Sequence, residues 1–145
     1  MAMSSRPDLA AMLVPLGRRL MQVERPILEA NDLTMWGYAI LLALGEEPVR
    51  TQAALAERIG ADKTRIIADL DELQQRGMIT REVDPDDRRV RLVAITPKGR
   101  RARDRAQAEI QRQEEELLSV LPVADRRAFL RAAQQLAESA QRGEL

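Results

Sequence analysis

The chain has 145 residues, balances 23 lysines and arginines with 23 aspartates and glutamates, and contains no cysteine or histidine. These absences exclude a disulfide framework, a thiol switch, a Ser-His-Asp or Cys-His nucleophile, and a zinc site with sulfur or imidazole ligands. The length fits one domain with helical extensions. Because aromatic residues are only 2% of the chain, its core must be aliphatic.

The first predicted element is an N-terminal helix that begins after Asp8, a residue type that caps helices. Its apolar residues recur at three- and four-residue spacing, as on one buried helical face. They are Leu9, Leu13, Leu16, Leu20 and Val23. Pro15 and Pro26 interrupt this pattern, because proline removes a backbone hydrogen bond and clashes with the preceding turn. We expect the helix to start or bend near Pro15 and to be disturbed again at Pro26.

A second helix is predicted after Thr34, which can cap it, and before Gly45, which closes it. The helix is apolar on nearly all sides, so it should lie in the middle of the domain. It carries Trp36 and Tyr38, the only Trp and Tyr of the chain. Two roles stay open for these residues: packing in the core, or lining a pocket for an aromatic ligand. In the second case we expect the pocket to include residues of the first helix as well, namely Leu16 and Leu20.

A helix-turn-helix pattern follows. Thr51 can cap a short helix over residues 52–59, Gly60 breaks that helix, and Asp62 can cap a longer one that Gly77 ends. In a helix-turn-helix the second helix enters the major groove of DNA with its N-terminal residues toward the base edges. The pattern alone is only moderately specific, because many helical hairpins satisfy it.

The N-terminal end of that second helix is a candidate DNA contact. If its apolar stripe of Ile66, Leu70 and Leu73 is buried, the exposed residues are Lys63, Thr64 and Arg65. Lysine and arginine donate to guanine, and threonine meets a polar edge or a thymine methyl group. The alternative is an ordinary solvated helix start.

A β-hairpin is predicted next, with strands over residues 79–83 and 90–95 around the charged turn DPDDRR of residues 84–89. This turn is too charged to bury. One of its aspartates can hold an arginine in a fixed pose while the other guanidinium reaches into a minor groove, whose negative potential attracts it. A solvated turn is again the alternative.

The C-terminal third is predicted to be helical, with one helix from Pro97 to Pro122 and another over residues 124–141. Both carry a stripe of small and aliphatic residues that needs a partner. The first helix of the chain is one candidate, and a second copy is the other. Positive charge also crowds one stretch, which holds Arg88, Arg89, Arg91, Lys98, Arg100, Arg101, Arg103 and Arg105.

Residues 73–79, Arg81, the turn at 84–89 and Ile-Thr-Pro-Lys-Gly at 95–99 together resemble the winged-helix signature of the MarR family of bacterial transcription regulators. The resemblance covers nearly the whole chain. It implies that Arg89 is the minor-groove arginine, that Asp87 orients the wing, and that Arg88 and Arg91 belong to the DNA-binding set. The chain departs from the family at Asp86, where many members carry arginine, and at residues 67–68, where Ile-Ala replaces a common Thr-Arg pair.

The resemblance implies a mainly α fold with a small β-hairpin wing (α+β), a winged helix-turn-helix with terminal dimerisation helices. Its expected parts are an N-terminal dimerisation region (1–33), a DNA-binding domain (34–99) and C-terminal dimerisation helices (100–145). We expect a homodimeric, sequence-specific regulator that represses from a pseudo-palindromic duplex. A small apolar or phenolic effector, bound between the dimer helices and the DNA-binding lobe, would release it, and no cofactor is needed.

Two other classes of function are weighed against this one. A winged helix can instead serve as a protein-interaction module for an acidic partner. An enzyme would have to use carboxylates with magnesium, but Asp69, Asp71 and Glu72 fall on one regular helix and no acids from separate segments converge. We therefore expect no enzyme. No apolar run approaches the roughly 20 residues of a membrane span, and no secretory leader is recognisable, so we expect a cytoplasmic protein without a membrane partner.

Overall fold

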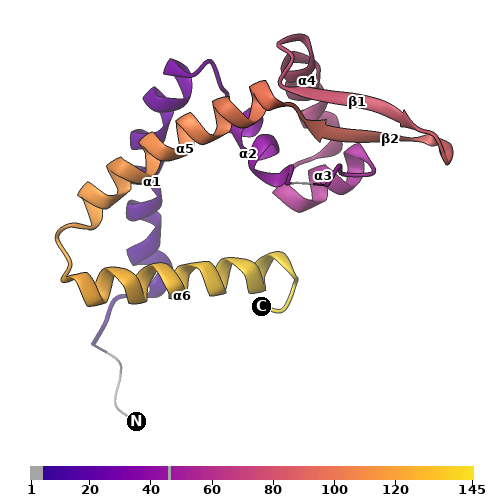
Figure 1. Ribbon diagram of the computed structural model, residues 1–145. Helices are drawn as coiled ribbons and strands as arrows, with labels where there is room; N and C mark the ends of the chain where they lie inside the picture. The colour runs from indigo at the N-terminus through magenta and orange to yellow at the C-terminus, as the bar shows by residue number, and fades with distance from the viewer. Residues whose placement is uncertain (1–4, 46) are drawn as a thin grey trace.

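The computed structural model describes residues 5–45 and 47–145, which form six α-helices and one antiparallel hairpin (Figure 1). The helices and strands are α1 (Leu9–Ala30), α2 (Met35–Ala43), α3 (Gln52–Ile59), α4 (Lys63–Gln75), β1 (Ile79–Asp84), β2 (Asp87–Ile95), α5 (Pro97–Leu118) and α6 (Val123–Gln141). The predicted mainly α fold with a hairpin wing is confirmed. Residues 1–4 of the predicted N-terminal region lie outside the described residues.

Four helices begin at a side-chain oxygen that accepts a hydrogen bond from a free backbone N–H of the first turn. These capping residues are Thr34, Thr51, Asp62 and Thr96. Asp8 precedes α1 but its side chain accepts no such hydrogen bond. Gly60 and Gly77 adopt φ angles of 73° and 74°, a left-handed conformation that favours glycine, and end α3 and α4 as predicted.

The helix α1 corrects one expectation. It runs from Leu9 to Ala30 with Pro15 and Pro26 inside it, so of the two alternatives at Pro15, a helix start or a bend, the start is excluded. Both prolines are exposed, so the carbonyl groups that they leave without a partner face water. The rest of α1 packs along α5 and buries Leu28, and tertiary packing of this kind outweighs the low helix propensity of proline.

We call α2, α3, α4 and the hairpin the winged lobe. Its core is aliphatic, as the composition required, and the side chains with no measurable exposure include Ile40, Leu41, Leu44, Leu55, Ile66, Leu70 and Val93. Helix α4 turns Ile66, Leu70 and Leu73 inward, as predicted. The lobe lies at one end of the molecule, and α6 crosses α1 at the other (Figure 1).

The hairpin is longer and its turn shorter than predicted. Strands β1 and β2 pair from Ile79 opposite Ile95 onward, and Asp84 still pairs with Asp87 beyond a register irregularity. The prediction of a six-residue turn is therefore wrong, because only residues 85 and 86 form the tip. Val49 adds an isolated bridge to β2.

Helix α5 meets the base of the hairpin at Gly99, where the backbones approach closely. A Cβ atom at this position would overlap the carbonyl oxygen of Met78 and would lie 2.9 Å from Cγ1 of Ile95. Next to it, the Thr96 hydroxyl donates to the Gly77 carbonyl at 2.6 Å. The start of α5 is thus fixed to the end of α4 and to β1.

Gly99→Ala is expected to lower the free energy of unfolding by roughly 2–4 kcal/mol, because the new methyl group meets backbone rather than a flexible side chain. Gly45→Ala is the matched control. Nothing lies within 4 Å of a Cβ at Gly45, and the change there should stay within about 0.5 kcal/mol. Urea unfolding of the two variants and the parent measures both values, and equal stability of all three would contradict the close approach.

Candidate functional site

The N-terminal end of α4 presents polar side chains to solvent. Lys63, Thr64 and Arg65 are exposed, where the sequence predicted them, because Ile66 and the rest of the stripe face the core. The side chains of Lys63 and Arg65 form no hydrogen bond or ion pair with any residue that the structure describes. Their charges are therefore available to an outside partner.

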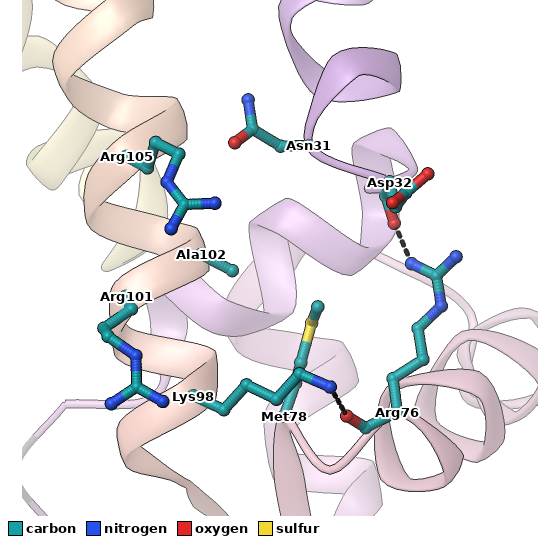
Figure 2. Close-up of a pocket in the computed structure, with 8 residues that line it drawn as sticks. All are labelled: Asn31, Asp32, Arg76, Met78, Lys98, Arg101, Ala102 and Arg105. Atoms are coloured by element: carbon teal, nitrogen blue, oxygen red, sulfur yellow. Dashed lines mark hydrogen bonds between the residues drawn. The ribbon is translucent and has the colours of Figure 1, made fainter.

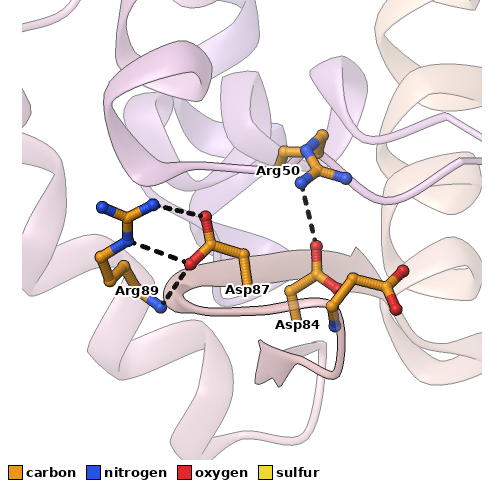
Figure 3. Close-up of polar contacts among 5 residues, drawn as sticks. Arg50, Asp84, Asp87 and Arg89 are labelled. Carbon is orange, nitrogen blue, oxygen red and sulfur yellow. Dashed lines mark hydrogen bonds and ion pairs between the residues drawn. The ribbon is translucent and has the colours of Figure 1, made fainter.

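The wing tip holds one arginine in place. Arg89 donates to Asp87 from Nε at 3.1 Å, from Nη2 at 3.3 Å and from its backbone N–H at 3.1 Å (Figure 3). The hydrogen bonds from Arg89 hold the pKa of the Asp87 carboxyl below its usual range. The Arg89 side chain is nevertheless 90% exposed. Asp87 thus orients a guanidinium that stays in solvent.

The other two predicted wing residues have no such support. Arg88 and Arg91 are both exposed on β2, and Arg91 lies opposite Val83 on β1. The side chain of neither makes a hydrogen bond or ion pair within the described ranges. Together with Arg89 they place three exposed arginines on β2, on a hairpin that also exposes Glu82 and Asp86.

A buried carboxylate at the wing was not predicted. Asp84 is only 4% exposed, so the expectation that the whole turn is too charged to bury is wrong. Its Oδ2 pairs with Nη2 of Arg50 at 3.0 Å, and its Oδ1 accepts the backbone N–H of Asp86 at 2.9 Å (Figure 3). A buried carboxylate is stable when it is paired and hydrogen-bonded in this way. The pair ties the segment before α3 to the wing.

Arg81 is a second residue whose role the sequence did not reveal. It donates to Gln74 at 2.6 Å, to Gln52 at 3.0 Å and to Asp71 at 2.5 Å. One guanidinium on β1 therefore reaches both helices of the helix-turn-helix. The geometry of its planar donors suits several acceptors at once, and the sequence motif showed only that an arginine stands at this position.

A cavity of about 280 Å³ lies where α1, α5 and α6 meet, and we call it the apolar cavity. Its lining is Leu13, Leu16, Gly17, Leu20, Glu114, Leu117, Leu118, Phe129, Leu130 and Ala133. It includes two of the four residues predicted for a ligand pocket, Leu16 and Leu20. Trp36 and Tyr38 do not line it.

Tyr38 instead belongs to a polar cluster next to the apolar cavity. Burial, with Glu24 and Glu114 nearby, raises the pKa of Tyr38 to about 12. Burial also raises the pKa of Glu24 and of Glu114 above their usual range, and each has another glutamate nearby that acts in the same direction. Arg103 carries the opposing charge near Tyr38. Glu114 thus connects this cluster to the apolar cavity.

A family model described as the MarR family matches residues 31–90. Among curated relatives, a protein named for transcriptional regulation of the hcr operon in Thauera aromatica is 30% identical over 105 residues, which is 72% of this chain and 63% of that protein. The transcriptional regulator HosA of Escherichia coli is 37% identical over 71 residues, which is 49% of this chain and 53% of HosA. The chain belongs to the MarR family. These alignments span only half to under two thirds of the relatives' own length.

Solved structures of MarR-family proteins extend the likeness to the whole fold. The transcriptional repressor CouR bound to a 23-mer DNA duplex is 29% identical, with a TM-score of 0.77 over 90% of this chain and 92% of that one. CouR from Rhodococcus jostii RHA1 bound to p-coumaroyl-CoA is 27% identical, with a TM-score of 0.78 over 95% and 96%. The MarR fold of this chain therefore includes its terminal helices.

No cluster of three or more His, Cys, Asp or Glu side chains that could hold a metal ion occurs in residues 5–45 and 47–145. Over the same ranges, none of the helices has the length and apolar character needed to cross a membrane.

Glu114→Gln is expected to raise the melting temperature at pH 7 by a few degrees. The folded-state pKa of Glu114 is raised, so the stability that its protonated form contributes is lost as the pH rises through that value. The gain from glutamine should therefore shrink below the ordinary glutamate pKa of 4.5. Thermal melts from pH 4 to pH 8 measure it.

Glu29→Gln is the control, because Glu29 is an exposed glutamate of α1. It should leave the melting temperature nearly unchanged at pH 7. A Glu114→Gln protein that is less stable than the parent at pH 7 would show that the carboxylate has a cationic partner instead of an unfavourable environment.

Proposed function

We propose that this chain is a sequence-specific DNA-binding transcription regulator. The observation that carries the proposal is the outward-facing charge of the winged lobe, where Arg89 is held by Asp87 at the tip and Lys63 and Arg65 stand unpaired at the start of α4. A recognition helix reads base edges from its N-terminal end, and a guanidinium fits the negative potential of a minor groove. The DNA-bound structure of its relative CouR supports this assignment.

Two copies form the functional unit in this proposal. Within one chain no residue of α6 is buried, and α1 and α6 expose large apolar side chains. Those side chains are Leu9, Met12, Leu13, Val14 and Met21 on α1, and Val123, Phe129, Leu130 and Leu136 on α6. Surfaces of this kind need a partner, and a two-fold dimer places two recognition helices about one DNA turn apart. The predicted boundaries at residues 33 and 99 separate terminal dimerisation helices from a DNA-binding domain in this proposal, although α5 runs across residue 99 without a break.

The regulator responds to a small ligand in this proposal, and it acts as a repressor. The apolar cavity supports a largely apolar or phenolic effector, because aliphatic side chains and Phe129 line it and Glu114 offers one polar group. Trp36 and Tyr38 stay candidates for an extension of the site beyond Glu114. A ligand that favours one spacing of the two lobes weakens DNA binding by a population shift.

Selection of bound duplexes from a random pool tests DNA binding. An inverted repeat with half-sites roughly 34 Å apart should be enriched, and its affinity should fall steeply with salt because phosphate contacts release counterions. No enrichment and a flat salt dependence would contradict the proposal. That outcome would favour the protein-interaction module.

Binding of protein variants to the enriched duplex, and to duplexes with single base changes, tests the assigned residues. Arg89→Ala should weaken binding to all duplexes and lower the salt slope by about 1, whereas Arg65→Ala should also change the preferred bases at a cost of roughly 1–3 kcal/mol. Arg112→Ala, an exposed arginine of α5 outside the winged lobe, is the control and should bind like the parent. If Arg89→Ala and Arg65→Ala both bind DNA like the parent, then Arg89 and Arg65 are not part of the DNA interface.

Leu20→Trp tests the effector site, because the larger indole would project into the 280 Å³ cavity and reduce the space left for a ligand. A panel of aromatic acids and their CoA thioesters, p-coumaroyl-CoA among them, should contain a compound that weakens operator binding of the parent. The variant should bind the operator normally but need about tenfold more of that compound, which corresponds to ~1.4 kcal/mol. Val120→Trp, on the exposed loop after α5, is the control. An unchanged response of the Leu20 variant would place the effector elsewhere.

A further inference from the structure

A second cavity, of about 480 Å³, lies between the turn after α1, the end of α4 and the start of α5 (Figure 2). We call it the basic cavity, because four cationic side chains line it: Arg76, Lys98, Arg101 and Arg105. Asp32 is its one acidic residue, and Met78 and Ala102 give it an apolar floor. Its volume suits a small ligand.

The cationic groups of the basic cavity are only partly used by the protein. Arg76 donates to the carbonyl of Asp32 and lies 3.6 Å from Glu72. Lys98 donates to the carbonyl of Arg76 at 2.6 Å, which uses one of its three N–H groups and neutralises no charge.

The two remaining arginines have no partner of their own. In the part of the chain that the structure describes, the side chains of Arg101 and Arg105 form no hydrogen bond and no ion pair. Figure 2 shows the guanidinium of Arg105 directed into the space between α5 and Asn31. The net charge around the basic cavity is therefore strongly positive.

This charge is unfavourable for α5 on its own. Residues 98, 101 and 105 are three and four positions apart, which places them on one face of the helix, where like charges repel. Lys98 also lies in the first turn of α5, where the helix dipole favours a negative group. A bound anion would remove both costs.

DNA is a poor occupant of the basic cavity. Arg76 follows the last residue of α4, whereas Lys63 begins that helix, and the 13 residues of α4 span roughly 20 Å. The cavity thus lies at the end of α4 opposite to the one that carries the DNA-facing residues.

We propose that the basic cavity binds a small organic anion whose phosphate or carboxylate oxygens accept hydrogen bonds from Lys98, Arg101 and Arg105. Two charged arginines and a lysine suit such an anion, and Met78 with Ala102 contacts its carbon skeleton. The site is separate from the apolar cavity. It does not depend on the assignment of DNA binding or of an effector.

Calorimetric titration of the DNA-free protein tests the site, with pyrophosphate and citrate as the probes and chloride used to hold the ionic strength constant. At least one probe should bind, and the one that binds identifies phosphate or carboxylate as the recognised group. Arg105→Ala and Arg101→Ala should each weaken binding about tenfold. Arg112→Ala removes an arginine from the same helix outside the cavity and should bind like the parent.

Three results would overturn the proposal. The first is no binding of either probe at millimolar concentration. The second is equal binding by the parent and by the Arg105 and Arg101 variants, with thermal melts confirming that the variants are folded. The third is a loss of duplex affinity in Arg105→Ala when the parent binds neither probe, because the basic cavity would then serve DNA phosphates.

Discussion

The rotation of α4 about its axis decides what the winged lobe presents to solvent. Ile66, Leu70 and Leu73 have at most 3% of their surface exposed, and burying three aliphatic side chains contributes several kcal/mol. Turning the helix to expose them would lose that energy. The other faces of the helix are therefore held outward, and Lys63, Thr64 and Arg65, which precede Ile66, need no interaction of their own to be exposed. Arg81 adds directional hydrogen bonds from β1 to the same helix.

The base of the wing is held by buried apolar side chains such as Ile79 and Val93, whereas its tip is positioned by charge. Its tip carries few apolar side chains, and what holds it is the buried Asp84 with Arg50 and the exposed Asp87 with Arg89. The two pairs act differently. An exposed pair contributes little to stability and serves to orient a side chain, whereas a buried carboxylate that loses its partner is strongly unfavourable. Asp84 therefore fixes the base of the tip, and Asp87 aims the arginine beyond it.

What the sequence predicted correctly depends on neighbours in the chain. Thr34, Thr51 and Asp62 cap helices through residues two or three positions away, and Gly60 and Gly77 end them through their own φ angles. The misses depend on distant contacts. Arg50 and Asp84 are brought together by the fold, and a charged turn gives no sign that one of its aspartates is buried. At Pro15 the sequence left open whether the first helix starts or bends there, because packing of α1 on α5, which maintains the helix through the proline, is encoded by no local pattern.

Helix α5 connects the base of the wing, the basic cavity and the apolar cavity. Its first turn is fixed to the hairpin base by the close approach at Gly99 and by Thr96. One face of its N-terminal half lines the basic cavity, and its C-terminal end lines the apolar cavity. Its 22 residues span roughly 33 Å as one rigid element. Because α5 is unbroken and its first turn is fixed to the hairpin, one helix joins the base of the wing to the walls of both cavities.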